Sequence, residues 1–387
     1  MRIGGTRQNA LALHAGARPG RPTRGETGNG PPHHVRSGRQ LRAATGSRMR
    51  PSTHAIVLLG QPLPAAVLRS VITLLDGLDA EVHAVRRLAD HPVTALELLV
   101  SAPGDAATTS VELRAALRAV ITDGESDIAV EPVGPRRRDK RMVVFDVDCT
   151  LLRGEVIDML AARAGRECEV VAITQAAMRG EIDFTASLHR RVAALAGLPA
   201  FALDEVVEKA ELTPGVRTTV QTLRQLGYPC GAISGGFSQV VQPIAAELGL
   251  DFFAANELEI RDGRLTGRVV GEVIDQRAKA AALRNFASYY EIPLAQCVAV
   301  GDGTNDIDML TTAGLGVAFN AKPALREIAD VALSYPFMDA LLFVLGVSAD
   351  EIAASRNAAG QLELSVAASW QAAGSGRDSA VAVKGFC

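Results

Sequence analysis

Short apolar segments alternate with helical stretches from residue 142 onward, and most of these segments end in acids, hydroxyls or glycines. The segments are "MVVFDVD", "CGAISG", "CVAVGDG" and "GLGVAFN". This alternation is typical of a parallel, doubly wound sheet with helices on both faces. Ligands of such sheets bind beyond the carboxyl ends of the strands. The sequence therefore predicts an α/β domain with a site at that edge of the sheet.

A longer helical stretch, at about 155–212, interrupts the alternation after the first strand. We expect it to be an inserted helical cap that lies over the strand ends. The core of the α/β domain is then built from residues 142–154 and 213–348.

Residues 53–133 show a different order of elements. A strand, a helix, two alternating strands, a second helix and a last strand follow one another, which is the βαββαβ order of ferredoxin-like domains. This block resembles an ACT domain, a small module that often binds amino acids beside metabolic enzymes. The turn "GQPLPAA" at 60–66 lacks the Asp that is usual there. A structural or dimerising role is therefore supported at least as well as effector sensing.

The remaining segments have the composition of unpacked chain. Residues 1–50 combine many Arg, Gly and Pro residues with one acid, Glu26, and carry no hydrophobic period. We expect a disordered leader, or translated sequence upstream of a start at Met49; a nucleic-acid-binding arm is the minor alternative. Residues 134–141 are predicted to be a charged linker, and residues 353–387 a disordered tail.

Composition excludes several classes of function. The formal net charge of −3 gives no reason to expect a nucleic-acid or membrane partner. No apolar run reaches the roughly 18 residues of a membrane helix. Five scattered cysteines without a C-x-x-C pair favour a reducing compartment. We therefore expect a cytoplasmic protein.

Two aspartates follow the first strand of the α/β domain. Because side chains alternate along a strand, Asp146 and Asp148 point to the same side. Two close carboxylates repel each other unless a positive charge lies between them, and Mg²⁺ prefers such oxygen ligands. The alternative is a solvated strand end whose acids cap the next helix.

Three further segments supply complementary groups. Ser234, Gly235 and Gly236 offer a hydroxyl and closely approaching backbone N–H groups, although such a turn is common. Lys279 lies near the start of a helix, where a surface lysine is the ordinary interpretation. Asp302, Asn305 and Asp306 follow another strand and glycine turn. Together with Asp146 and Asp148 they provide the nucleophile, proton donor, metal ligands and phosphate contacts that phosphoryl transfer requires.

The set D-x-D-x-T, S-G-G, Lys and G-D-G-x-N-D, in this order over 142–348, resembles the haloacid-dehalogenase superfamily of phosphatases. The resemblance implies a Rossmann-like core with a helical cap and Mg²⁺ as the cofactor. It implies the following roles: Asp146 as nucleophile and metal ligand, Asp148 as proton donor and as metal ligand through its backbone carbonyl, Asp302 as metal ligand, Ser234, Gly235 and Lys279 as phosphate ligands, and Asn305 and Asp306 as supports of phosphate and metal.

Four residues of the expected cap resemble those of the phosphoserine phosphatases. In this resemblance Glu155 pairs with the substrate ammonium, Arg191 holds its carboxylate through two hydrogen bonds, and Met178 and Phe184 shield the site from water. Each has a structural alternative, as an exposed helix charge or as core filling. Together they imply hydrolysis of O-phospho-L-serine to L-serine, the last step of serine biosynthesis, through an aspartyl phosphate.

Position 149 is usually Ser in this family, and here it is Cys149. We expect activity to survive, and a thiol beside the metal loop raises the hypothesis of sensitivity to oxidants. Two other functions stay open: a phosphatase or phosphotransferase for another small phosphomonoester, and an amino-acid-binding regulatory protein with a relic phosphatase half. The ACT-like block predicts a homodimer.

Overall fold

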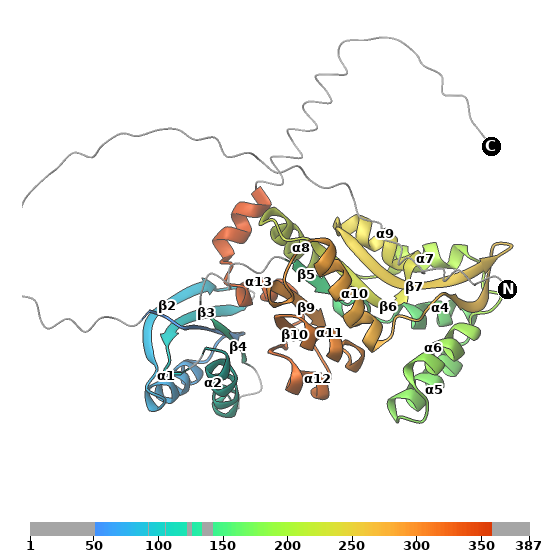
Figure 1. The fold of residues 1–387 in the computed structure, drawn as a ribbon. Helices are drawn as coiled ribbons and strands as arrows, with labels where there is room; N and C mark the ends of the chain where they lie inside the picture. Colours follow the sequence, from blue (N-terminus) through green and yellow to red (C-terminus); the bar gives the residue numbers. More distant parts are fainter. Residues whose placement is uncertain (1–50, 92, 105, 122–125, 134–141, 358–387) are drawn as a thin grey trace, which may run out of the picture.

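The larger sheet has seven strands in the order β11-β10-β9-β5-β6-β7-β8 (Figure 1). Its strands are β5 (Met142–Phe145), β6 (Cys230–Phe237), β7 (Phe252–Arg261), β8 (Arg264–Val270), β9 (Cys297–Gly301), β10 (Leu315–Phe319) and β11 (Val331–Leu333). All neighbours pair in parallel except β7 and β8, which form an antiparallel hairpin. The structure, a computed structural model, describes residues 51–91, 93–104, 106–121, 126–133 and 142–357.

Helices cover both faces of this sheet because β5 is apolar on both sides. Val143 and Phe145 belong to the hydrophobic core that includes α8 (Val216–Gln225), α9 (Ser238–Leu248) and α13 (Ala340–Val344). Met142 and Val144 belong to a separate core with α10 (Gln276–Tyr289), α11 (Ile307–Thr312) and α12 (Pro323–Ile328). This is the layered arrangement that the alternating segments predict. The predicted fold class is confirmed.

Four α-helices lie between β5 and α8. They are α4 (Val156–Ala164), α5 (Glu167–Met178), α6 (Phe184–Ala193) and α7 (Phe201–Lys209), and we call residues 155–212 the helical insertion. Its two connections to the core run side by side, since Arg153 N donates to Glu211 O and Thr213 N donates to Leu151 O, each at 2.9 Å. The insertion also contacts the β7–β8 hairpin, where Gly197 N donates to Leu265 O at 2.8 Å.

The smaller unit has the predicted βαββαβ order. It consists of β1 (His54–Gly60), α1 (Ala65–Gly77), β2 (Glu81–Ala89), β3 (Thr94–Ser101), α2 (Ala106–Val120) and β4 (Asp127–Pro132), with the antiparallel strand order β2-β3-β1-β4. Helices α1 and α2 pack on one face of this sheet, against Ile56 and Leu58. Val57 and Leu59, on the other face, join the hydrophobic core of the larger unit. Strand β1 is therefore buried on both faces, which explains its uninterrupted apolar sequence.

Polar contacts strengthen the junction between the two units. The buried carboxylate of Asp127 accepts hydrogen bonds from Ser334 N at 2.5 Å and Ser334 Oγ at 2.8 Å. Arg114 Nη1 lies 2.8 Å from Asp330 Oδ1. These contacts lie where β4 runs beside β11. The smaller unit is thus an integral part of the folded chain rather than a tethered appendage.

Some sequence-based boundaries need correction. Residues 349–357 are helical, and Ser355 Oγ donates to Gln225 Oε1, so the tail predicted to begin at 353 is ordered as far as 357. Strands β7, β8 and β11 were not predicted, because their partly exposed, irregular patterns or short length give little periodic signal. The predicted leader at 1–50, the linker at 134–141 and the tail from 358 lie outside the described residues.

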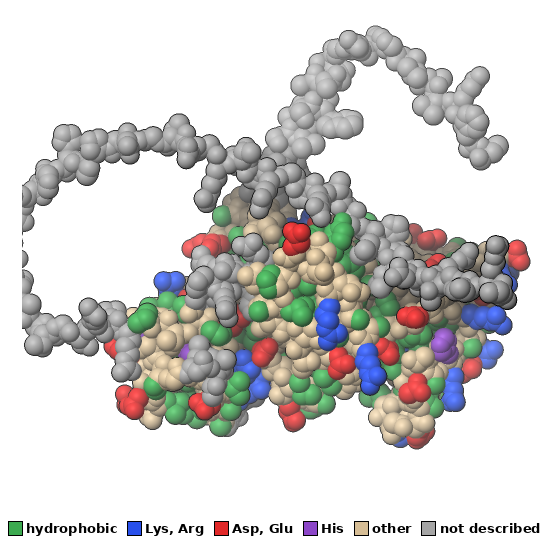
Figure 2. Space-filling model, in the orientation of Figure 1, with side chains coloured by type: hydrophobic (Ala, Val, Ile, Leu, Met, Phe, Trp, Pro, Cys, Tyr) green, Lys and Arg blue, Asp and Glu red, His purple; other side chains and the backbone are tan. Residues whose placement is uncertain are grey.

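On the face drawn in Figure 2, Lys and Arg side chains are interspersed with Asp and Glu. This distribution agrees with the small formal net charge of −3. Within the described residues, no helix combines the length and the apolar character that a membrane crossing requires.

Candidate active site

The predicted acidic residues meet at the carboxyl edge of neighbouring strands β5 and β9. Asp146, at the end of β5, is 3% exposed, and its N–H donates to Val300 O on β9 at 2.8 Å. Asp302 and Asp306 follow β9. Because β5 and β9 are parallel neighbours, their polar ends share one edge, and carboxylate atoms of Asp146, Asp302 and Asp306 lie within 4.8 Å of one another.

Lys279 joins two of these acids beneath the site. Its Nζ lies 2.7 Å from Asp146 Oδ1 and 2.8 Å from Asp306 Oδ1, and the lysine is fully buried. Asp306 Oδ2 also accepts from Gly303 N at 3.1 Å. The side-chain carboxylate of Asp275 accepts from Ala278 N and so caps the helix α10 that carries Lys279. The lysine is therefore fixed as a charge partner of the acids rather than as a surface cation.

The site holds three clustered carboxylates and one lysine that contacts two of them. The pKa values of Asp146 and Asp302 are raised. Burial raises the pKa of Asp146 well above its usual range, and Asp306 adds to the rise while Lys279 opposes it. Burial, and then the charge of Asp306, raises the pKa of Asp302 to about 7. A divalent cation would relieve this repulsion, and an all-oxygen donor set suits Mg²⁺. The residues present therefore fit the metal that the sequence predicts.

Asp148 is oriented differently from the other acids. Its Oδ1 accepts from Val156 N at 2.9 Å, so its carboxylate is turned toward the start of α4. It is not among the three clustered carboxylates. Burial, followed by the charge of Glu155, raises the pKa of Asp148 to about 7. A carboxyl group that titrates near neutral pH is suited to give and take a proton.

The irregular turn at residues 234–236, near the end of β6, brings the backbone close to Asp148. Ser234 is fully buried, and its Oγ accepts from Gly236 N at 2.8 Å. A Cβ at Gly236 would lie 2.8 Å from Asp148 Oδ2, which is closer than a real side chain approaches. Asn256 Nδ2 donates to Gly235 O at 2.8 Å and so fixes the turn from the β7 side. Glycine at 236 is required by this close approach.

A cavity of about 340 Å³ connects these residues with the helical insertion. The core contributes Asp146, Asp148, Gly235, Gly236, Phe237, Asp302, Gly303, Thr304, Asn305 and Lys322, and the insertion contributes Glu155, Ile157, Thr174, Ala177, Met178, Ile182, Phe184, Ser187, Leu188 and Arg191. Of the residues predicted from sequence, Ser234, Lys279 and Asp306 do not line it. All three are 0% exposed and lie behind the wall that Asp146 and Gly235 form.

The predicted substrate-selecting residues lie on the insertion side of this cavity. Glu155 precedes α4; burial raises its pKa, while the charge of Arg191 on α6 lowers it. The ring of Phe184 packs close to Gly235, since a Cβ on that glycine would lie 3.2 Å from Phe184 Cζ. Met178 lines the cavity but is 67% exposed, so in this conformation it shields the site only partly.

Several residues of the cavity wall were not singled out from sequence. Thr174 and Ser187 are helical hydroxyls without a motif, so only the packing of α5 against α6 places them there. Lys322 lies just after β10, and its position beyond a strand end was the available signal. It is exposed at the cavity mouth.

Cys149 occupies a strained position in the loop after Asp148. Its φ is 57°, in the left-handed region that few side chains adopt. Burial, and then the charge of Glu155, raises the pKa of its thiol to about 12. The reactive form of a cysteine is the thiolate, which a high pKa suppresses at neutral pH. The raised pKa argues against a reactive thiol in the metal-free protein, and oxidant sensitivity at Cys149 stays a hypothesis.

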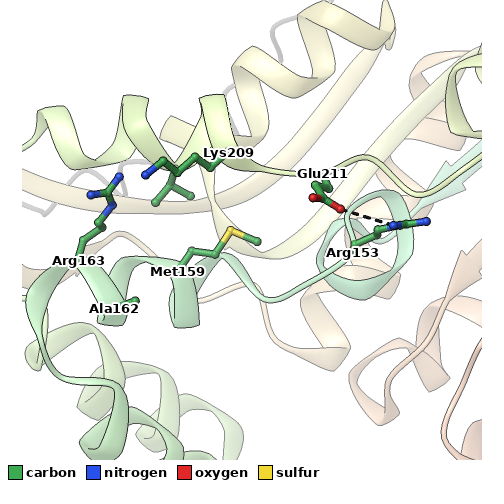
Figure 3. A pocket seen from close by; sticks show the side chains of 7 residues that line it. Arg153, Met159, Ala162, Arg163, Lys209 and Glu211 are labelled. Carbon is green, nitrogen blue, oxygen red and sulfur yellow. Dashed lines mark ion pairs between the residues drawn. The ribbon is translucent and has the colours of Figure 1, made fainter.

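A second cavity, of about 380 Å³, lies away from the acids. It is bordered by Arg153, Met159, Ala162, Arg163, Val206, Lys209 and Glu211, from α4, α7 and the two connections of the insertion (Figure 3). The ion pair of Arg153 and Glu211, 3.5 Å apart, bridges the two connections. No residue predicted to take part in the reaction lines this cavity.

Comparisons with known proteins identify relatives of both parts of the chain. The family model for haloacid dehalogenase-like hydrolases matches residues 143–311, and a model for ACT domains matches residues 52–131. A phosphoserine phosphatase of Mycobacterium tuberculosis is 56% identical over 306 residues, which cover 79% of this chain and 74% of that protein. A phosphoserine phosphatase of Streptomyces coelicolor is 48% identical over 307 residues, with the same coverage of both chains.

Solved structures show the same fold. A haloacid dehalogenase family hydrolase of Salmonella enterica serovar Typhi aligns over 75% of this chain and 98% of its own, with a TM-score of 0.65 and 28% identity. A phosphoserine phosphatase described as substrate-bound aligns over 53% of this chain and 97% of its own, with a TM-score of 0.51 and 41% identity. On this evidence, the chain belongs to the haloacid dehalogenase-like hydrolases and, among them, to the phosphoserine phosphatase family, with an ACT domain ahead of the hydrolase core.

Proposed function

We propose that this protein hydrolyses O-phospho-L-serine to L-serine and phosphate, as the last step of serine biosynthesis. One observation carries the proposal: a single cavity is lined both by the acids suited to phosphoryl transfer and by Glu155 and Arg191 of the insertion. The substrate has a phosphate, an ammonium and a carboxylate group. The cavity offers a complementary group for each. The relatives at 56% and 48% identity are phosphoserine phosphatases, which supports this substrate.

In the first half of the proposed reaction, a carboxylate oxygen of Asp146 attacks phosphorus. A bond forms between that oxygen and phosphorus, and the bond from phosphorus to the serine oxygen breaks with its electron pair on the serine oxygen. Asp148 donates a proton to this oxygen and releases serine. A pKa of about 7 allows Asp148 to carry this proton at neutral pH. One solved relative is described as a phospho-aspartyl intermediate analogue, with 42% identity and a TM-score of 0.51.

In the second half, Asp148 takes a proton from water and the resulting hydroxide oxygen attacks phosphorus. The bond to Asp146 breaks, phosphate leaves, and both aspartates return to their starting states. Lys279 Nζ lies 2.7 Å from Asp146 Oδ1 and is placed to orient that carboxylate. Gly235 and Asn305 line the cavity where we propose that the phosphate is held. Ser234 supports the turn that contains Gly235, since its Oγ accepts from Gly236 N.

We propose that Asp146, Asp302 and the backbone carbonyl of Asp148 hold Mg²⁺, with Asp306 in support. The clustered carboxylates and their raised pKa values motivate this assignment. Bound Mg²⁺ would keep the carboxylates ionised and offset the charge of the phosphoryl group.

The decisive experiment measures phosphate release from O-phospho-L-serine, its D-enantiomer and O-phosphoethanolamine, with and without Mg²⁺. We expect Mg²⁺-dependent hydrolysis with a clear preference for O-phospho-L-serine. Comparable kcat/KM for phosphomonoesters that lack the carboxylate would favour the broader phosphatase function. Absence of turnover on all phosphoesters would favour the relic alternative, although Asp146, Asp148, Ser234, Lys279 and Asp302 are all present.

We further propose a cytoplasmic homodimer that is joined through the ACT unit. Strand β2 is the open edge of the smaller sheet, with Val85 52% exposed, whereas β4 at the other edge lies beside β11. An open edge can pair with that of a second copy. The cysteines that the structure describes form no disulfide, as in a reducing compartment. Sedimentation should give a dimer, and Val85→Lys should shift it toward monomer; a monomeric parent protein would contradict the proposal.

A further inference from the structure

Three buried polar atoms of the helical insertion have no hydrogen-bond partner and belong to residues that line the cavity. They are Thr174 Oγ1, Ser187 Oγ and Arg191 Nε, and all three residues line the cavity that contains Asp146. Ser187 is only 2% exposed. Buried polar groups in folded proteins are nearly always hydrogen-bonded, because an unmade bond is costly. Three unpaired groups at one place therefore point to a ligand that completes them.

The three atoms come from two helices that pack against each other. Ser187 and Arg191 are four residues apart on α6, so their side chains lie on the same face of that helix. Thr174 extends from α5, which contacts α6. The wall of the cavity is thereby lined by two hydroxyls and a guanidinium group.

The chemistry of these groups selects an anion. The guanidinium of Arg191 donates hydrogen bonds and cannot accept them, and each hydroxyl has a proton to donate. A carboxylate accepts at two oxygens with about four lone-pair positions, which is enough for three donors. The phosphate end of the substrate is assigned to the core side of the cavity, beside Asp146 and Gly235. The anion that remains for the insertion side is the substrate carboxylate.

We propose that Ser187 and Thr174 donate hydrogen bonds to the carboxylate of the substrate beside Arg191, so that the carboxylate subsite consists of three donors from α5 and α6. This inference rests on the proposed function. Ser187 and Thr174 bind the substrate and take no part in the transfer of the phosphoryl group. Their loss should weaken binding and leave the chemical step intact.

The test compares Ser187→Ala and Thr174→Val on two substrates. O-phosphoethanolamine keeps the phosphate and ammonium groups of O-phospho-L-serine and lacks only the carboxylate. Each variant should raise KM for O-phospho-L-serine about tenfold, the scale for a hydrogen bond to a charged group, with kcat within about twofold. The kcat/KM for O-phosphoethanolamine should not change. Thr185→Val, which removes a hydroxyl of α6 that does not line the cavity, is the matched control.

Product inhibition provides a second measurement. L-serine retains the carboxylate, so its inhibition constant should rise with KM in both variants, whereas inhibition by inorganic phosphate should stay the same. Alanine favours helix more than serine, so the melting temperature of Ser187→Ala should not fall. Equal losses on both substrates, or no loss on either, would overturn the inference.

The design separates this inference from the proposed function. If the parent protein hydrolyses O-phosphoethanolamine as well as O-phospho-L-serine, no carboxylate subsite exists and both statements fail. If the parent strongly prefers O-phospho-L-serine while Ser187→Ala and Thr174→Val keep its KM, only the three-donor subsite is wrong. A selective rise in KM supports both.

Discussion

The ammonium nitrogen of Lys279 lies 2.7 Å from Asp146 Oδ1, and 0% and 4% of the two side chains is exposed to solvent. The lysine also lies 2.8 Å from Asp306 Oδ1 and does not line the cavity. Its charge therefore acts on the two carboxylates that it contacts. The buried contact between Lys279 and Asp146 therefore affects the stability of the core as well as the proposed reaction.

Replacing Lys279 with Met should destabilise the protein strongly. Asp146 and Asp306 would lose their shared cation, and removal of one partner of a buried pair costs about 3–5 kcal/mol. Urea unfolding at pH 8 without metal measures this loss. Lys209→Met, at an exposed lysine beside the second cavity, serves as the control and should change stability little. A similar effect of the two substitutions would show that the buried contact contributes nothing.

Asp146→Asn should abolish turnover and leave the fold intact. An amide cannot accept the phosphoryl group, and removing one of the crowded acids should raise the melting temperature of the metal-free protein at pH 8. The assignment as nucleophile is wrong if the variant retains more than about a hundredth of the parent rate, a barrier difference of roughly 2.7 kcal/mol. Asp204→Asn, an exposed acid on α7, is the control that should retain full activity.

The stability of the metal-free protein should fall as pH rises toward 8. Asp302 has a pKa of about 7 in the folded protein, raised chiefly by burial, against about 3.9 in an unfolded chain. Folding therefore favours the protonated form of Asp302. The contribution of this carboxyl group to the free energy of unfolding is complete below about pH 4 and is lost as pH rises through about 7.

Melting curves between pH 5 and pH 8 test this dependence. Asp302→Asn should flatten the profile and melt higher than the parent at pH 8 without metal. Mg²⁺ should raise the melting temperature of the parent more at pH 8 than at pH 5, since it binds the ionised carboxylates, and should barely affect the variant. Parallel profiles for the two proteins would show that Asp302 does not titrate in this range.

Arg191→Ala should raise KM for O-phospho-L-serine steeply. The expected loss is on the order of 2–4 kcal/mol, the scale for removing one partner of a desolvated charge pair. Arg191→Lys should restore only part of it, because a single ammonium group cannot donate two parallel hydrogen bonds. Hydrolysis of a small aryl phosphate, which has no carboxylate, should hardly change. Equal losses on both substrates would assign Arg191 to the folding or closure of the insertion.

Gly236→Ala should lower kcat on the order of a hundredfold, because small displacements of reacting groups have effects of that size. The added Cβ would lie 2.8 Å from Asp148 Oδ2 and 3.0 Å from Ser234 Oγ, so the carboxyl group must move. Gly77→Ala is the matched control: nothing lies within 4 Å of its Cβ, and it should stabilise α1 by about 0.5–1 kcal/mol. Unchanged kcat in Gly236→Ala would contradict the proposed role of Asp148.

The sequence by itself determined the two-part architecture and the acidic edge of the larger sheet. Alternating apolar segments predict parallel strands whose polar ends share one edge. The period-two expectation for Asp146 and Asp148 was wrong, because β5 ends at Phe145 and Asp148 lies in the next turn with its carboxylate directed toward Val156 N. Local patterns are sufficient to predict this edge because the carboxyl ends of neighbouring parallel strands lie together in any packing of the sheet. The βαββαβ order of the smaller unit follows from the same kind of periodicity.

Only the tertiary structure decided which side chains are buried and what they contact. Lys279 reads as a surface lysine in "DQRAKAAAL", yet α10 places it behind Asp146, fully enclosed. Ser187 and Thr174 carry no motif, and the packing of α5 against α6 brings both residues to the cavity wall with buried, unpaired hydroxyls. The burial of both faces of β1 likewise depends on the junction with the larger unit. Burial arises from contacts between segments that are distant in sequence, so local patterns do not encode it. The pKa shifts and the unpaired donors of this site both result from that burial.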